Sequence, residues 1–208
     1  MRTRVKFCGI TRPEDAEAAV RLGADALGFV FDRQSARFIE PARAAMIRRR
    51  LPAFVTAVAL FRNAAAAQVK EALAALYPAI AQFHGEETPV FCEGFGAGYL
   101  RAVPMKQAPD LAGFARQHPG AGAFLLDAHA PGEAGGQGQT FDWEKVPADF
   151  SAPVVLAGGL TPENVGAAIA MVRPYAVDVS SGIESARGIK DLGKMRSFIE
   201  AVRKADGR

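Results

Sequence analysis

Cysteine is scarce in this sequence, which holds two, Cys8 and Cys92, in 208 residues. They do not form a C-x-x-C pair, and two thiols alone supply neither a disulfide framework nor the ligands of a structural zinc site. We therefore expect free thiols and a cytoplasmic protein. Histidine is nearly as scarce, with three residues, and none has a second ligand at the spacing of a metal motif. We expect no metal centre.

Long apolar stretches and strong charge are missing as well. No apolar run reaches the roughly 18 residues of a membrane-spanning helix, and the N-terminus leads into a strand rather than a secretory signal. The formal net charge is only +3, and the arginines are scattered apart from Arg48–Arg50. These features argue against membrane and nucleic-acid partners. A few cationic groups suit a small anionic substrate instead.

The sequence does contain a regular alternation of β-type apolar runs with alanine-rich helical segments. Strands are expected at Val5–Cys8, Ala26–Phe31, Phe54–Phe61, Ile80–Phe83, Tyr99–Val103, Ala123–Asp127, Val154–Ala157 and Ala176–Val179. Helices are expected at Pro13–Leu22, Ala42–Arg50, Ala65–Leu76, Pro162–Val172 and Leu192–Lys204. Strands that alternate with helices predict an α/β protein with a parallel sheet.

The number of these units predicts how the sheet closes. Each unit has about 26 residues, enough for a strand, a helix and two short loops, and eight such units predict a small (β/α)8 TIM barrel. We expect one domain over residues 1–208. An open doubly wound sheet is the alternative, but the glycine-rich dinucleotide turn after its first strand is not in the sequence. Few periodic apolar positions follow the fifth strand, so an irregular or missing helix is predicted there.

Small residues follow the seventh and eighth predicted strands, where a barrel of this kind binds phosphate. Gly158 and Gly159 let backbone N–H groups approach a ligand closely, and Ser180, Ser181 and Gly182 repeat the arrangement one strand later with two hydroxyl groups. The alternative is that these glycines only relieve tight turns. Two such loops side by side predict a phosphate site.

Two groups at strand ends are candidates for acid–base chemistry. Asp127 ends the sixth strand, where partial desolvation is expected to raise its pKa and suit it to a general acid. Cys8 ends the first strand and shares a face with Lys6, whose ammonium group is expected to favour the thiolate and make a competent base. The alternatives are a helix cap or loop ion pair for Asp127, and a small buried hydrophobe for Cys8.

Arg37 and His84 lie in loops after predicted strands. The planar guanidinium of Arg37 suits a substrate carboxylate, although a solvated surface arginine is the alternative. His84 is expected to hold its loop by hydrogen bonds rather than to bind a metal. A polar, glycine-rich loop at 128–140 follows the sixth strand, and loops of that length in compact domains are usually functional.

Several motifs in a fixed order carry a resemblance to a known family. They are K-F-C-G-I-T-R-P-E-D at 6–15, G-A-D-A-L-G-F-V-F at 23–31, S-A-R-F at 35–38, Q-F-H-G-E-E at 82–87, L-L-D at 125–127, G-G-Q-G-Q-T-F-D-W at 135–143, L-A-G-G-L-T-P-E-N-V at 156–165 and V-D-V-S-S-G-I-E at 177–184. Over nearly its full length, the chain resembles the phosphoribosylanthranilate isomerases of tryptophan biosynthesis. It departs from the commoner pattern at Arg62, Gln137 and Gln139.

The resemblance implies a cofactor-free Amadori rearrangement of N-(5-phosphoribosyl)anthranilate to 1-(2-carboxyphenylamino)-1-deoxyribulose 5-phosphate. Asp127 would be the general acid that opens the furanose ring, Cys8 the general base at C2 of the sugar, and Arg37 the ligand of the anthranilate carboxylate. Asp178 would lie near the substrate. The phosphate would be held by Gly158, Gly159, Ser180, Ser181 and Gly182. The expected partner is this small molecule alone, bound by a monomer or homodimer.

Other activities remain open on the sequence. The related barrel isomerase of histidine biosynthesis performs the same rearrangement, but its family has a second phosphate loop and an aspartate in place of Cys8. A non-catalytic phosphate-binding barrel is a further alternative, although such a protein would not need both Cys8 and Asp127. A metal-dependent pentose-phosphate epimerase would need histidine and aspartate ligands at suitable strand ends.

Overall fold

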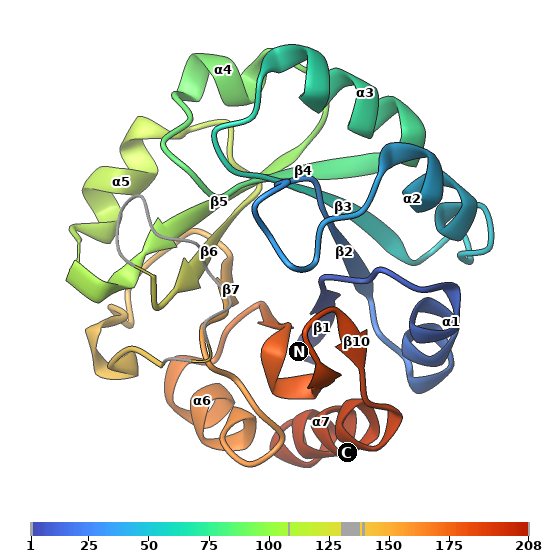
Figure 1. Cartoon of the computed structure of the whole chain (residues 1–208). Coiled ribbons are helices and arrows are strands. Elements are labelled where there is room, and N and C mark those ends of the chain that lie inside the picture. Colours follow the sequence, from blue (N-terminus) through green and yellow to red (C-terminus); the bar gives the residue numbers. More distant parts are fainter. Residues whose placement is uncertain (1, 108, 130–137, 139, 208) are drawn as a thin grey trace.

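Eight parallel strands close into a barrel in the computed structural model, which describes residues 2–107, 109–129, 138 and 140–207 (Figure 1). Each strand pairs with the next along the chain, and the last pairs with the first. The strands are β1 (Arg4–Cys8), β2 (Ala26–Val30), β3 (Thr56–Phe61), β4 (Ala79–Phe83), β5 (Tyr99–Pro104), β6 (Ala123–Asp127), β7 (Val154–Leu156) and β8 (Ala176–Val179). The predicted (β/α)8 barrel is confirmed.

Helices surround the barrel as an outer layer (Figure 1). They are α1 (Pro13–Leu22), α2 (Pro41–Arg48), α3 (Ala66–Leu76), α4 (Pro89–Glu93), α5 (Leu111–Gln117), α6 (Val165–Val172) and α7 (Leu192–Ala205). Three of them begin with a proline in the first turn, where its missing N–H costs nothing. α1 ends at Gly23, whose φ of 98° is the left-handed conformation that glycine adopts freely. No helix in the described part of the chain is long and apolar enough to cross a lipid bilayer.

The segments after β5 and β6 are irregular. A 3-10 turn at Met105–Gln107 precedes α5, which has only seven residues, so the helix predicted to be irregular or missing is present and short. Between β6 and β7 the described residues form one 3-10 turn, Trp143–Lys145. Most of the predicted glycine-rich loop, including Gln137 and Gln139, lies outside the described residues.

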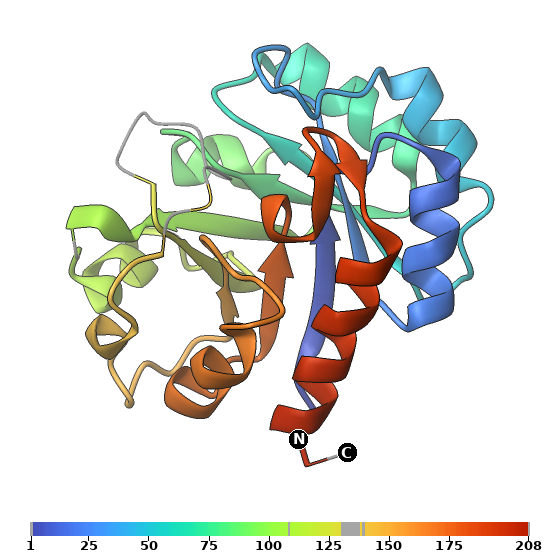
Figure 2. The ribbon, with the colours of Figure 1, turned by 60° about the horizontal axis from the view of Figure 1, so that its bottom comes forward.

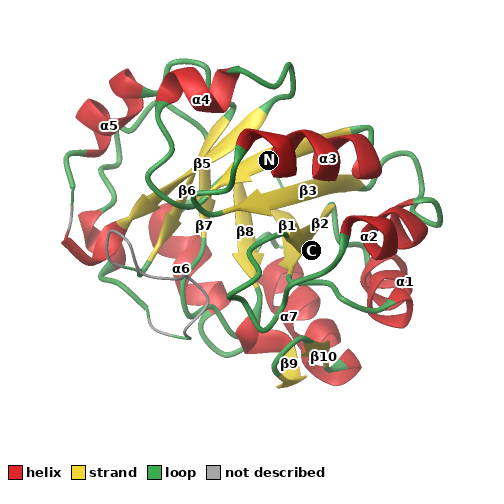
Figure 3. Ribbon diagram, turned by 45° about the horizontal axis from the view of Figure 1, so that its top comes forward, coloured by secondary structure: helices red, strands yellow, loops and turns green. Residues whose placement is uncertain are grey.

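A small hairpin between β8 and α7 was not predicted. A 3-10 turn at Ser181–Ile183 leads into β9 (Glu184–Ala186), which pairs antiparallel with β10 (Ile189–Lys190). Gly188 makes the turn between them with a φ of 79°. Figure 3 shows the hairpin beside the start of α7. It places Glu184 and Lys190 close to the barrel mouth.

The core has two parts, because most strand residues are buried on both faces of the sheet. Large side chains such as Phe7, Phe29 and Phe83 fill the layer between strands and helices. Smaller ones, including Val58 and Leu125, fill the barrel interior. This double burial explains why the strands read as continuous apolar runs.

The two ends of the chain lie side by side (Figure 2). The Asp206 carboxylate after α7 accepts hydrogen bonds from Thr3 N at 2.9 Å and from Thr3 Oγ1 at 2.8 Å. These contacts hold the last helix against the entry to β1, next to the β1–β8 pairing that closes the barrel.

Candidate active site

A cavity of about 470 Å³ opens at the carboxyl ends of the strands. Its lining includes nearly all of the site residues expected from the sequence: Cys8, Arg37, Asp127, Gly158, Gly159, Asp178, Ser180 and Ser181. Gly182 is the one expected residue that does not line it. Ligand sites of TIM barrels lie at this face, so the fold and the sequence point to the same place.

Cys8 lies beside a buried ion pair that spans the junction of β1 and β8. Lys6 and Asp178 are partners in the strand register, and Lys6 Nζ donates to Asp178 Oδ1 at 2.7 Å. Gly28 on β2 faces the same group. A Cβ atom at Gly28 would lie 2.7 Å from Cys8 Sγ and 3.1 Å from Lys6 Nζ. The thiol and the ammonium group therefore fit here only because this position of β2 has no side chain.

The protonation of Cys8 differs from the expectation. Burial raises the pKa of the thiol most strongly, Lys6 lowers it, and the Asp178 carboxylate raises it again, so that the pKa of Cys8 is raised overall. Lys6 acts in the predicted direction. Burial and the Asp178 carboxylate together outweigh Lys6, so the free protein does not favour the thiolate overall.

Asp127 is enclosed by two histidines at the end of β6. His84 Nε2 lies 3.2 Å and His129 Nδ1 3.7 Å from Asp127 Oδ2, and the two rings face each other with centroids 4.5 Å apart. Burial raises the pKa of Asp127, but polar contacts and charge interactions with His129 and His84 outweigh it, so the pKa is lowered. The prediction of a raised pKa is wrong, since it considered burial without these neighbours.

His129 was not recognised from the sequence, although a signal was present. Residues two apart in an extended chain lie on the same side, so D-A-H at 127–129 places Asp127 and His129 together. Spacing along the chain gives His84 no partner ligand. The ends of β4 and β6 nevertheless bring His84 and Asp127 together from distant segments.

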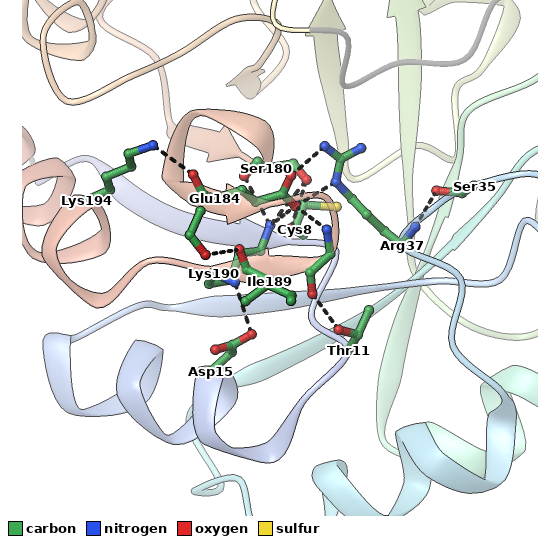
Figure 4. A network of polar contacts seen from close by, with 12 residues as sticks. Cys8, Thr11, Asp15, Ser35, Arg37, Ser180, Glu184, Ile189, Lys190 and Lys194 are labelled. Atoms are coloured by element: carbon green, nitrogen blue, oxygen red, sulfur yellow. Dashed lines mark hydrogen bonds and ion pairs between the residues drawn. The ribbon is translucent and has the colours of Figure 1, made fainter.

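Arg37 is held in place by the hairpin and is not a solvated surface residue. Its Nε and Nη2 atoms donate to the two carboxylate oxygens of Glu184, both at 2.8 Å (Figure 4). Lys190 Nζ donates to Glu184 Oε1 at 2.9 Å and to the Ser180 carbonyl oxygen at 3.1 Å. Ser180 Oγ in turn donates to the Cys8 carbonyl oxygen at 3.0 Å. The network joins the loop after β2 to the ends of β1 and β8.

Glu184 and Lys190 are the residues of this network that sequence reasoning missed. Both are buried, and the pKa of Lys190 is lowered because burial outweighs the attraction of Glu184. The hairpin that carries them is too short to be recognised as strands. The only signal was Glu184 at the end of the V-D-V-S-S-G-I-E motif.

The glycine-rich loops after β7 and β8 are packed against each other. Gly158 and Gly159 have φ angles of 77° and 61°, which glycine adopts without strain. A Cβ at Gly182 would lie 2.0 Å from the Leu160 carbonyl oxygen. Gly182 thus lets the loop after β8 approach the loop after β7, which gives it a structural position behind the cavity wall.

Comparison with known proteins places the chain in a family. The family model for N-(5'phosphoribosyl)anthranilate (PRA) isomerase matches residues 5–201. The chain belongs to this family. The phosphoribosylanthranilate isomerase of Nitrosococcus oceani is 52% identical over 202 residues, which are 97% of this chain and 98% of that protein.

Solved structures of family members share the fold and most of the length. One, in complex with reduced 1-(o-carboxyphenylamino)-1-deoxyribulose 5-phosphate, is 37% identical with a TM-score of 0.85 and covers 99% of this chain and 100% of its own. Another, described as monomers of a dimeric isomerase from Thermotoga maritima, is 36% identical with a TM-score of 0.85 and covers 97% and 99%. The chain is therefore an enzyme, a phosphoribosylanthranilate isomerase of tryptophan biosynthesis.

Proposed function

We propose that Asp127 and Cys8 are the general acid and the general base of the isomerisation, acting without a cofactor. One observation carries this assignment. The carboxylate at the end of β6 and the thiol at the end of β1 line a single cavity, as do Arg37 and the glycine- and serine-rich loops. In this cavity, a substrate with a carboxylate at one end and a phosphate at the other can place the carboxylate on Arg37 and the phosphate on the glycine- and serine-rich loops.

The proposed first step opens the sugar ring. Asp127 gives a proton to the ring oxygen, the bond from that oxygen to C1 breaks, and the lone pair of the anthranilate nitrogen forms the C1=N bond of a protonated Schiff base. Cys8 then removes the proton from C2, and the electron pair left at C2 forms a C1=C2 double bond while the C1=N electrons return to nitrogen. The resulting enolamine shifts its hydroxyl proton to C1 and becomes the ketone.

The remaining residues are proposed to bind the substrate. Arg37 uses two of its donor groups on Glu184, and its Nη1 group is available to meet the anthranilate carboxylate in a fixed direction. Asp178 keeps Lys6 charged beside the reacting carbons. The phosphate is proposed to lie on backbone N–H groups of the loops after β7 and β8, at Gly158, Gly159, Ser180 and Ser181, with Gly182 bringing the two loops together.

We also propose a cellular compartment and an oligomeric state for the protein. The protein is proposed to work in the cytoplasm as a monomer or homodimer that binds this small phosphorylated molecule. The two free cysteines and the biosynthetic role of the family support a reducing compartment. A dimeric family member from Thermotoga maritima supports the homodimer.

The two catalytic roles are tested by substitution. Cys8→Ala and Asp127→Asn should each lower kcat by ~10²–10⁴-fold, the usual contribution of a general acid or base, with little change in KM. Turnover is measured as loss of fluorescence of phosphoribosylanthranilate generated in the assay. Cys92→Ala is the matched control, since it removes the other buried free thiol outside the cavity. Wild-type kcat in either active-site variant would contradict the role assigned to that residue.

A further inference from the structure

The group formed by His84, Asp127 and His129 has features that a proton donor alone does not require. Each of the three residues is at most 7% exposed, and one ligand atom from each lies within 4.8 Å of the others. His84 Nε2 and His129 Nδ1 are buried and have no hydrogen-bond partner among the described residues. Two buried ring nitrogens are therefore directed at one carboxylate, and neither has a second partner among the described residues.

The spacing of these atoms matches a metal site. Zn²⁺ holds nitrogen and oxygen ligands at about 2.0–2.1 Å, so two ligands of a tetrahedral ion are about 3.3 Å apart. The two nitrogen-to-carboxylate distances are 3.2 and 3.7 Å. All three ligand atoms lie within 4.8 Å of one another, and a movement of the His129 ring by roughly 1 Å would bring them toward the spacing that zinc requires.

The donor set selects the kind of ion. Two imidazoles and one carboxylate with an open position are typical of Zn²⁺ and of other divalent transition metals, and they are a poor site for Mg²⁺ or Ca²⁺. His84 and Asp127 line the cavity, so the open position faces the place where substrate binds.

Gln82 can support His84 as a ligand. Its amide lies against His84 Nδ1, with Nε2 at 3.1 Å, while the buried Oε1 atom has no partner among the described residues. A half-turn of this amide lets Oε1 accept from a proton on Nδ1. His84 then presents the lone pair of Nε2 toward Asp127, which is unfavourable beside a carboxylate and favourable around a cation.

We propose that His84, Asp127 and His129 bind one Zn²⁺ ion, and that the bound ion inhibits the isomerase. The inhibition rests on the proposed function, because a carboxylate that coordinates zinc cannot carry the proton that opens the sugar ring. Binding itself does not depend on that role. Zinc therefore acts on this enzyme as a reversible inhibitor at its acid group and not as a cofactor.

The binding is tested by calorimetric titration of chelator-treated protein with Zn²⁺ and by the visible spectrum of the Co²⁺ form. We expect one ion per chain. His129→Phe keeps an aromatic ring against His84 and removes the ligand nitrogen, and it should weaken binding by roughly tenfold or more. His118→Phe is the matched control, since His118 is buried, stacks on Phe114 and does not line the cavity. It should bind zinc like the wild type.

Two results would overturn the site. One is equal Zn²⁺ affinity in the wild type and His129→Phe. The other is a thiolate charge-transfer band in the Co²⁺ spectrum that vanishes in Cys8→Ser, because it would place the ion on the cavity thiol instead. A Co²⁺ spectrum without that band, unchanged in Cys8→Ser, supports the proposal.

The inhibition has its own test. At substrate concentrations well below KM, the free Zn²⁺ concentration that halves wild-type turnover should equal the calorimetric Kd, and it should rise by roughly tenfold or more in His129→Phe. Zinc binding without loss of turnover would overturn the inhibitory part. Wild-type turnover in zinc-free Asp127→Asn would instead show that the proposed acid is wrong, and it would leave the calorimetric result on the site standing.

Discussion

At the scale of single residues, the resting protonation of the site is the reverse of what the first chemical step needs. The pKa of Asp127 is lowered and that of Cys8 is raised, so the free enzyme holds a carboxylate and a thiol. The reaction proposed above starts from a carboxylic acid and a thiolate. The carboxylate–thiol form and the acid–thiolate form carry the same number of protons. The acid–thiolate form, which the reaction needs, is the minor one in the free enzyme.

This reversal predicts the pH dependence of kcat/KM. Because the active and resting forms have equal proton counts, their ratio is constant between the two pKa values, and kcat/KM should be flat through the neutral range. Above the pKa of Cys8 a further proton is lost, and kcat/KM should fall with increasing pH. The pH at which kcat/KM falls should coincide with the pH at which the ultraviolet absorbance of the Cys8 thiolate rises, measured in a Cys92→Ser background. It should move to higher pH in Lys6→Met, since Lys6 lowers the pKa of the thiol.

A different profile would contradict the assignment. If kcat/KM rises across neutral pH with the titration of one group, then Cys8 alone limits the reaction and Asp127 is not the acid that must be protonated.

Most of the proposed site residues could be named from the sequence, but His129, Glu184 and Lys190 could not, and neither could the electrostatics. Strand alternation correctly places Lys6 and Cys8 on one face. It says nothing about Asp178, which reaches Lys6 only because β8 pairs with β1. For the same reason, the order of residues does not show that His84, directly after β4, lies beside Asp127 and helps to lower its pKa. Residues on or just after other strands help to determine the protonation states of Cys8 and Asp127, and a single sequence does not show which residues these are.

At the scale of elements, the hairpin β9–β10 is the support of the proposed carboxylate-binding arginine. Glu184 binds Arg37 through two hydrogen bonds and also contacts Lys190, and all three side chains are largely removed from solvent. An arginine fixed in this way loses little conformational freedom when it meets a ligand.

Glu184→Gln is expected to raise KM with a smaller effect on kcat. The substitution keeps the shape but removes the charge, and hydrogen bonds to charged groups contribute about 1.5–3 kcal/mol, so a rise in KM on the order of tenfold is expected. Steady-state kinetics measure it. Glu40→Gln is the control, because it removes an exposed ion pair with Arg33, and it should leave KM unchanged. An unaltered KM in Glu184→Gln would show that the hairpin does not position Arg37.

The contact between the two glycine-rich loops predicts a second effect. Gly182→Ala cannot be accommodated without moving the loop that carries Gly158 and Gly159, because its Cβ would collide with a backbone oxygen at 2.0 Å. We expect KM for the phosphorylated substrate to rise and the unfolding temperature to fall.

Gly166→Ala provides the matched comparison within α6. A Cβ there meets nothing within 4 Å, and alanine in a helix is more favourable than glycine by roughly 0.5–1 kcal/mol. It should raise the unfolding temperature without changing KM. Equal kinetics in the two variants would contradict the role given to Gly182.

Element boundaries show where sequence patterns stop being informative. The third strand was predicted to begin at Phe54, but it begins at Thr56, and Phe54 is 100% exposed. The apolar side chain of Phe54 lengthens the apolar run in the sequence, although it does not pack in the core. The hairpin β9–β10 was missed because strands of two or three residues have no measurable periodicity.

At the scale of the whole molecule, the count of strand–helix units was enough to predict the closed barrel. Closure itself depends on contacts between the beginning and the end of the chain. The Lys6–Asp178 pair and the Asp206 contacts with Thr3 both join β1 to the last units of the chain.

Asp206→Ala should therefore lower the stability of the whole barrel. It removes the hydrogen bonds that Thr3 N and Thr3 Oγ1 donate to the carboxylate, worth together about 1–2 kcal/mol, which corresponds to a fall in Tm of roughly 2–8 °C for a chain of this size. Thermal unfolding followed by circular dichroism measures the change. Glu200→Ala, at an exposed position of α7, is the control and should shift stability by less than about 0.5 kcal/mol. An equal Tm in Asp206→Ala and Glu200→Ala would show that the chain ends do not contribute to closure.

The pairing of the first strand with the last also sets when the enzyme can first work during its synthesis. On the ribosome, Cys8 and Arg37 emerge early, whereas Asp178, Glu184 and Lys190 follow roughly ten to forty seconds later at ordinary elongation rates. Until then β1 has an unpaired edge, which is prone to associate with other extended chains. A nascent chain therefore gains catalytic competence only after Glu184 has appeared, so a product terminated before Asp178 lacks the partners of both Lys6 and Arg37 and should be inactive.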